Sequence, residues 1–197
     1  IVVEDDLIFS KYFIEFMNKS LITYNHDKKV CSISGYTIKT NHNLPELFFL
    51  NFINSWGWAT WKRSWNIFEP NAKKLAQEIA QKKYINKFNL DSSYPFYRMI
   101  KKNIIGENDS WAIRWYASIF LNNMLTLYSS KTLVKNIGMD KNATNTKKKI
   151  DQQSLSKSKI KISKIDITED KYSRKIYSNY HKLLSVKLIL KNIFKFL

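Results

Sequence analysis

The chain has 197 residues, 44% of them hydrophobic and 15% aromatic, which is typical of one principal globular domain and excludes a disordered chain. A single cysteine, Cys31, excludes an internal disulfide framework, and its apolar neighbours predict a buried thiol. The formal net charge of +17 allows an acidic partner, such as a nucleic acid or an anionic membrane. Residues 147–197 carry 14 Lys and Arg against 4 Asp and Glu, so most of the excess charge lies there.

The chain opens with three β-branched or aliphatic residues, 1–3, followed directly by three acids, 4–6. The apolar run without polar alternation predicts a short strand covered on both faces, and we expect the chain to be part of a longer protein because a core strand would begin at its first residue. Neighbouring carboxylates repel one another, and a cation or hydrogen-bond donors relieve that repulsion. Since ligands of open α/β sheets bind at the carboxyl ends of strands, the acids predict a site.

The pattern after the acids predicts an amphipathic helix over residues 10–25, capped by Ser10. Its apolar face comprises Phe13, Phe16, Met17, Leu21 and Tyr24. A second strand follows over residues 29–34, and then a long irregular segment over residues 35–54. The order strand, helix, strand predicts a right-handed crossover and a partly parallel sheet.

The next segments predict helices over residues 70–88, from a capping Asp91 to residue 102, and over residues 109–123. A strand and a turn follow over residues 125–138. The polar composition of residues 141–170 predicts a mobile or loosely packed connection. The last segment, 171–197, predicts a basic amphipathic helix, which could dock on the domain, lie in an anionic membrane surface, or contact nucleic acid or a partner protein.

Three stretches stand out: the acids 4–6, SWGWATWKRSW at 55–65 and NDSW at 108–111. Each also has a purely structural interpretation. The acids could form a solvated turn, the tryptophans could belong to the core, and Asp109 could cap a helix. Sugar transfer from a nucleotide diphosphate would use all three. It needs a cation held by carboxylate oxygen, a base for the acceptor hydroxyl, and flat apolar platforms for sugar rings.

Asp6 could hold such a cation. Asp109 is suited to act as the base, because a helix N-terminus favours its ionised form. The platforms could come from four tryptophans beside the flexible Gly57, namely Trp56, Trp58, Trp61 and Trp65.

These stretches resemble a known family. VVEDDLIFSKYFIEFMNKSL with KVCSISGY is similar to the metal-binding region of nucleotide-diphospho-sugar glycosyltransferases with the GT-A fold, of the N-acetylglucosaminyltransferase I type. SWGWATWKRSW resembles the G-W loop of these enzymes and of bacterial family 2-like sugar transferases. NDSWAIRW resembles their base motif, and LYSSKTLVKNIGMDKNATN their closing strand and loop.

The resemblance spans residues 1–146 and implies an α/β fold, with a GT-A-like (Rossmann-like) mixed sheet flanked by helices but without its N-terminal nucleotide-binding strands. It implies a catalytic domain over 1–146, while the composition of the remaining chain predicts a polar basic linker over 147–170 and a basic amphipathic helix over 171–197. The implied activity is inverting, metal-dependent transfer of a sugar from a nucleotide-diphosphate donor, a UDP-sugar, to a glycan or glycolipid acceptor. Bacterial surface polysaccharide biosynthesis is a setting that fits.

By the same resemblance, Asp6 ligates the divalent metal, Mn²⁺ or Mg²⁺, and Asp109 is the general base. The donor is contacted by Glu4, Asp5, Gly57, Trp58 and Trp111. Inversion occurs in one displacement, so no nucleophilic residue is expected. Some bacterial relatives have a histidine after the closing segment where this chain has Asn145, so no second protein ligand to the metal is expected from that loop.

We also expect a cytoplasmic enzyme whose basic terminal helix contacts the inner membrane face, with no nucleic acid partner. Two other functions stay open. A two-metal nuclease would need more acids from later strands, and the central chain offers few. A basic module that binds nucleic acid or membranes without catalysis would not need the acids, and its binding would fall steeply with salt.

Overall fold

The structure, a computed structural model, describes residues 1–138 and 151–193, with side chains as far as residue 186. The chain divides into two compact units, each built from two separate stretches. The first unit comprises Ile1–Asn66 and Met124–Asp170, and the second comprises Ile67–Asn123 and the segment that begins at Lys171. Residues 1–146, predicted as one catalytic domain, therefore contribute to both units.

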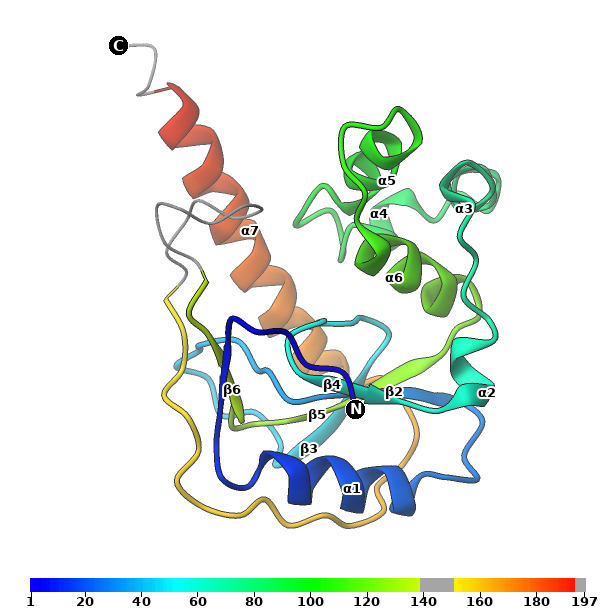
Figure 1. The fold of residues 1–197 in the computed structure, drawn as a ribbon. Coiled ribbons are helices and arrows are strands. Elements are labelled where there is room, and N and C mark those ends of the chain that lie inside the picture. The colour runs from blue at the N-terminus through cyan, green and yellow to red at the C-terminus, as the bar shows by residue number, and fades with distance from the viewer. Residues whose placement is uncertain (139–150, 194–197) are drawn as a thin grey trace. The chain divides into compact units, whose positions relative to one another are not determined.

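The first unit is built on a four-stranded mixed sheet of order β3-β5-β2-β4 (Figure 1). Its centre is the parallel pair β2 (Val30–Ser34) and β5 (Leu125–Ser129), and the antiparallel strands β3 (Leu47–Leu50) and β4 (Trp58–Thr60) complete it. Every residue of β2, β3 and β5 is buried. The predicted mixed α/β sheet is confirmed. Strand β3 lies in the segment predicted to be irregular.

Cys31 on β2 is fully buried, as predicted. Its Sγ donates to the Leu125 carbonyl oxygen at 3.3 Å, and burial raises the pKa of the thiol to about 12. A thiol with that pKa is neutral at physiological pH and inert as a nucleophile.

The predicted first helix forms as α1 (Phe13–Thr23) and lies against one face of the sheet, where it contacts β2 and β4 (Figure 1). Its buried face carries Phe13, Phe16 and Met17, as the spacing predicts. The prediction that Ser10 caps this helix is wrong, because Tyr12 holds the cap position. Ser10 Oγ instead donates to the Ser156 carbonyl oxygen at 2.7 Å.

The described part of the predicted loose connection, residues 151–170, runs along α1 and is tied to it at several points. Lys159 pairs with Glu15, and the Tyr24 hydroxyl donates to the Ser163 carbonyl oxygen and accepts from the backbone N–H of Ile165. These contacts show that residues 151–170 pack specifically on the first unit. The rest of that prediction, up to residue 150, lies outside the described residues.

The prediction of a buried strand over residues 1–3 is wrong. These side chains are 48%, 39% and 52% exposed, and Val2 makes an isolated bridge to Trp58 at the edge of the sheet. The strand forms after the acids, as β1 (Leu7–Phe9), which pairs antiparallel with β6 (Val134–Asn136) in a separate two-stranded sheet. The predicted crossover from this strand through α1 to β2 within one sheet is therefore also wrong.

The described part of the second unit is helical. The predicted helix over residues 70–88 is divided at Lys83, where φ is +58°. Phe88 stacks on Tyr116 with ring centroids 4.6 Å apart, and the Tyr116 hydroxyl donates to the Phe88 carbonyl oxygen at 2.9 Å. These rings form the centre of the unit. Its helices are α3 (Ala72–Gln81), α4 (Ile85–Phe88), α5 (Phe96–Ile104), α6 (Trp111–Leu121) and α7 (Lys171–Ile193).

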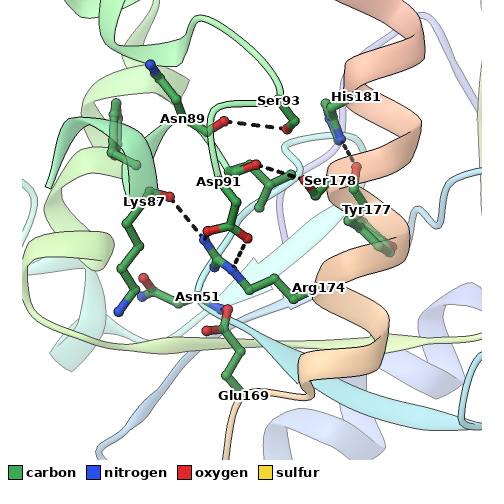
Figure 2. A network of polar contacts seen from close by, with 12 residues as sticks. Asn51, Lys87, Asn89, Asp91, Ser93, Glu169, Arg174, Tyr177, Ser178 and His181 are labelled. Atoms are coloured by element: carbon green, nitrogen blue, oxygen red, sulfur yellow. Dashed lines mark hydrogen bonds and ion pairs between the residues drawn. The ribbon is translucent and has the colours of Figure 1, made fainter.

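A strained turn follows α4, in which Leu90, Asp91 and Ser92 all have positive φ. Each such non-glycine residue costs about 1–2 kcal/mol, so the turn must be stabilised by its contacts. Figure 2 shows Arg174 of α7 directed at the turn, where its Nε and Nη2 donate to the two Asp91 carboxylate oxygens at 2.8 and 2.9 Å. The prediction that Asp91 caps a helix is wrong, because its carboxylate binds Arg174 and α5 begins at Phe96.

His181 of α7 lies among aromatic rings of the second unit, with its ring centroid 5.8 Å from that of Tyr94 and 5.4 Å from that of Tyr180. Its Nδ1 lies 2.8 Å from the Tyr177 carbonyl oxygen, so the neutral ring carries its proton on Nδ1 (Figure 2). Burial lowers the pKa of His181 to about 4.

This depressed pKa makes the stability of the second unit depend on pH. Between pH 6.5 and 4 the unfolded chain binds a proton that the folded ring does not, so stability is lost as pH falls through that window. We expect the free energy of unfolding to fall by about 2 kcal/mol between pH 7 and 5, measured by urea titration.

His181→Phe should remove that dependence, whereas His26→Gln, a change at an exposed histidine, should keep it. Parallel pH profiles for the wild type and His181→Phe would contradict the prediction.

Helix α7 confirms the predicted terminal helix as far as Ile193. The side chains of its expected basic stripe, Lys187, Lys191 and Lys195, lie outside those that the structure describes. Among the described residues, no helix combines the length and the apolar character that crossing a membrane requires.

Candidate functional site

Two glycines join the segments at the carboxyl end of β2. The Gly35 N–H donates to the Gly57 carbonyl oxygen, and the Gly35 carbonyl accepts from the Leu133 N–H, both at 2.8 Å. A Cβ at Gly35 would lie 2.6 Å from the Phe13 ring and 2.8 Å from the Gly57 carbonyl oxygen, so only glycine fits. Gly57 has φ +57°, a conformation that glycine adopts without strain. The G-W loop and the segment leading to β6 therefore meet where β2 ends.

The acidic turn lies beside the same junction. Val2 and Trp58 exchange two backbone hydrogen bonds, at 2.8 and 3.1 Å, so the chain enters the turn along the edge of β4. After the turn, β1 runs antiparallel to β6. Within the first unit, the structure thus assembles three of the predicted motif segments: the acids, the G-W loop and the closing strand. They meet at the carboxyl end of β2, and ligands of open α/β sheets bind at the carboxyl ends of strands.

Asp6 is held by the closing strand. Its backbone carbonyl accepts from the Ile137 N–H at 2.8 Å, and its Oδ2 accepts from the Asn136 side-chain amide at 3.1 Å. The backbone of Gly138 passes so close that a Cβ there would overlap the Asp6 carboxylate. The other carboxylate oxygen, Oδ1, is buried and has no hydrogen-bond partner among the described residues. An unpaired buried carboxylate oxygen is unfavourable unless a ligand satisfies it.

Glu4 and Asp5 have exposed side chains in the same turn. Partial desolvation, followed by the negative charges of Asp6 and Asp5, raises the pKa of Glu4. The three carboxylates therefore repel one another, as their sequence predicts. Among the described residues, no three or more His, Cys, Asp and Glu side chains converge on a point where they could hold a metal ion. Of these acids, Asp6 is the one that faces another segment.

The tryptophans of residues 55–65 differ in exposure. Trp58 is 2% exposed and its ring lies 6.0 Å from that of Trp65, so it presents no open face in this conformation. Trp61 is half-buried beneath the Arg63 guanidinium, 4.4 Å from its ring centroid. Trp56 is half-buried next to Gly57, in edge contact with Tyr36 at 4.7 Å. Trp65 is 40% exposed, so Trp56 and Trp65 are the tryptophans of this stretch whose rings are open enough to carry a sugar.

Asp109 and Trp111 lie in the second unit. Asp109 immediately precedes Ser110, whose side chain caps α6 by accepting from the Ile113 N–H at 3.4 Å. The Asp109 side chain is 95% exposed and pairs with Arg114 at 3.2 Å. The prediction of an acid at a helix N-terminus is met, one residue before the cap. Asp109 thus belongs to the second unit, whereas Asp6 belongs to the first.

Asn136, which contacts Asp6, and Gln152, which contacts Asn136, carry no signal in the sequence. Asn136 reads as an ordinary strand residue, and Gln152 lies in a polar stretch. In the structure the Gln152 side chain accepts from the Asn136 N–H at 2.8 Å and donates to the Asn136 carbonyl oxygen at 2.7 Å. Only the fold brings these side chains to the acidic turn.

No family model, no curated protein and no solved structure matches this chain.

Proposed function

We propose that this chain is an inverting, metal-dependent glycosyltransferase of the GT-A type, which transfers a sugar from a nucleotide-diphosphate donor, a UDP-sugar, to a glycan or glycolipid acceptor. The observation that carries the proposal is the meeting of the acidic turn, the G-W loop and the closing strand at one edge of a mixed sheet. A solvated acidic turn would not need its carboxylate enclosed by Asn136 and Gly138.

The residues present fit a divalent cation, because the Asp6 carboxylate is the hard oxygen ligand that Mn²⁺ or Mg²⁺ prefers, and its Oδ1 is buried without a partner among the residues that the structure describes. A bound cation would neutralise the charge that develops on the leaving diphosphate. Asp6 would hold the cation, while the exposed carboxylates of Glu4 and Asp5 would accept hydrogen bonds from donor hydroxyls. The remaining donor contacts are assigned to Gly57 and Trp111, whereas the buried Trp58 ring, which was also predicted to contact the donor, would support the G-W loop from within.

Asp109 would accept the proton of the acceptor hydroxyl as that oxygen attacks the anomeric carbon. Its exposure leaves the carboxylate accessible to an acceptor, and it lies one residue before the cap of α6. One displacement inverts the anomeric centre, so a nucleophilic side chain is not required. The buried, neutral thiol of Cys31 agrees with that scheme.

The test is a panel of nucleotide sugars incubated with the chain and Mn²⁺, with nucleoside diphosphate release and donor consumption followed by chromatography. The panel is run on this chain and on a chain extended upstream, and slow hydrolysis of one donor by the extended chain, abolished by a chelator, is the expected result even without an acceptor. Isothermal titration of both chains with UDP and Mn²⁺ gives a second readout. If neither chain consumes a donor or binds a nucleoside diphosphate in the presence of metal, the proposal fails.

We also propose that the enzyme acts at the cytoplasmic membrane face, where glycolipid acceptors reside, and contacts it through α7. Leu183 and Val186 are 63% and 44% exposed, and they lie one turn apart beside the exposed Lys182. Apolar and basic side chains together favour an anionic membrane surface. Co-sedimentation with vesicles that contain phosphatidylglycerol, lost in high salt and in Leu183→Glu, tests this contact.

A further inference from the structure

Asn136 is a buried side chain whose two amide atoms are unequally paired. It is 6% exposed, its Nδ2 donates to Asp6 Oδ2, and its Oδ1 has no hydrogen-bond partner among the described residues. Buried side-chain oxygens are nearly always paired with protein or with a ligand. Two unpaired buried oxygens, Oδ1 of Asn136 and Oδ1 of Asp6, thus belong to side chains that touch each other.

The backbone of Asn136 is held on both sides, so it cannot shift to bring the unpaired Oδ1 to a hydrogen-bond donor. It is paired with β1 on one side, in register with Leu7, and with the Gln152 side chain on the other. Gln152 satisfies both the N–H and the C=O of Asn136, as a neighbouring strand would. The side-chain amide, in contrast, can turn about its bond to Cβ.

The spacing of the two side chains suits a cation. A half-turn of the amide would place Oδ1 of Asn136 where Nδ2 now lies, 3.1 Å from Asp6 Oδ2. In an octahedral site with metal–oxygen distances of about 2.1 Å, neighbouring ligand oxygens are about 3 Å apart. The Asn136 amide would then ligate a bound metal ion through its oxygen. Without a metal ion, its N–H donates to Asp6, as in this structure.

We infer that Asn136 is a second oxygen ligand, beside Asp6, for the divalent cation, and that Gln152 is the positioning residue that holds it there. The inference rests on the proposed function for the role of the cation, but binding of Mn²⁺ by these residues can be measured without any turnover. Two protein oxygens leave the other coordination positions to water and to the diphosphate of the donor. Mn²⁺ alone should therefore bind weakly, and UDP should tighten it.

The experiment is a titration of the full chain with Mn²⁺, with free Mn²⁺ measured by electron paramagnetic resonance and thermal unfolding followed in parallel. Asn136→Leu, which keeps the size and removes the oxygen, should weaken Mn²⁺ binding about tenfold or more, the loss typical for a residue that supports a metal site. Asn136→Asp should tighten binding about tenfold, because a carboxylate is the stronger ligand, and Mn²⁺ should raise its melting temperature more than that of the wild type.

Asn51→Asp is the matched control, because Asn51 is also buried in the first unit and its Nδ2 donates to the Met124 carbonyl oxygen at 2.6 Å. It should lose thermal stability that Mn²⁺ does not restore. If Asn136→Asp behaves in the same way, or if Asn136→Leu binds Mn²⁺ like the wild type, Asn136 only supports the fold and the inference is overturned.

The same titrations separate this inference from the proposed function. Weaker Mn²⁺ binding in Asn136→Leu, without nucleoside diphosphate binding or donor consumption in the wild type, would support the cation site and contradict the transferase. Donor consumption with unchanged Mn²⁺ affinity in both Asn136 variants would support the transferase and overturn the role of Asn136.

Discussion

Asp6→Asn is expected to abolish metal-dependent donor consumption, with a loss of roughly 1,000-fold, the scale found when one preorganised electrostatic group is removed from an active site. The substitution keeps the shape of the side chain and an oxygen that can accept from the Asn136 amide. It removes the negative charge that a divalent cation requires. The measurement is initial rate against Mn²⁺ concentration, with the donor that the panel identifies.

The structural cost of this change should be small, so the melting temperature should move by only a few degrees. Asp166→Asn is the matched control, since Asp166 is an exposed acid of the first unit, and it should retain full activity. Turnover by Asp6→Asn that still rises with Mn²⁺ would remove Asp6 from the metal site. It would leave the acidic turn without the role on which the proposed mechanism depends.

The second large effect is expected on stability, at Arg63. This residue lies in the short helix α2 (Lys62–Trp65), and its guanidinium forms hydrogen bonds at the C-terminus of α1. It donates at 3.0–3.3 Å to the backbone carbonyl oxygens of the C-cap residue of α1, of the loop that follows and of the first residue of β2, namely Tyr24, Asn25, Asp27 and Val30. The last carbonyls of a helix have no partner within it, and a cation there also interacts favourably with the helix dipole.

Arg63→Met, which keeps an unbranched side chain but removes the guanidinium over Trp61, should destabilise the first unit by about 3 kcal/mol, because several hydrogen bonds from a charged donor, most of them partly buried, are lost together. Arg63→Lys should lose nearly as much, since a single ammonium cannot reach carbonyls that the planar guanidinium spans. Amide hydrogen exchange over residues 24–30 reports the loss locally. Lys62→Met, at the exposed neighbour, is the control, and Arg63→Lys exchange rates equal to those of the wild type would refute this account.

The elements that the sequence predicted well are those whose signal is local. The helical spacing of Phe13, Phe16 and Met17 predicted α1, and the short stretches VCSIS and LTLYS, rich in apolar residues, predicted the strands β2 and β5. In each case the signal lies within a window of a few residues, although the burial of Ser32 and Thr126 on the second face could not be predicted from it.

The errors arose where burial depends on distant partners. Residues 1–3 have the composition of a core strand, yet only Val2 meets another segment, at Trp58. Strand β3 is four residues long and lies between polar stretches, and its burial comes from β5, nearly 80 positions later. Asp91 was predicted to cap a helix because the neighbouring sequence gives no sign that its carboxylate pairs with Arg174, 83 positions later.

The candidate site divides in the same way. The sequence predicted the acids and the glycine of the G-W loop, because clustered charge and an isolated Gly between tryptophans are visible in a short window. It did not predict Asn136, which lies 130 positions from Asp6 and belongs to an ordinary strand. It also could not show that the Trp58 ring is covered, because exposure is set by the packing of the whole unit.

Because the two units are interleaved along the sequence, neither can fold completely until late in the synthesis of the chain. The first unit begins at residue 1, yet its central strand β5 appears only after the whole of Ile67–Asn123 has been made. The second unit is likewise incomplete until Arg174 has been synthesised and can bind Asp91 in the strained turn. A nascent chain that ends at Asn123 therefore holds two unfinished units, with the edges of β2 and β3 bare where β5 should lie. Bare strand edges invite pairing with other chains, so this intermediate is the species most exposed to aggregation and the one that a chaperone would need to hold.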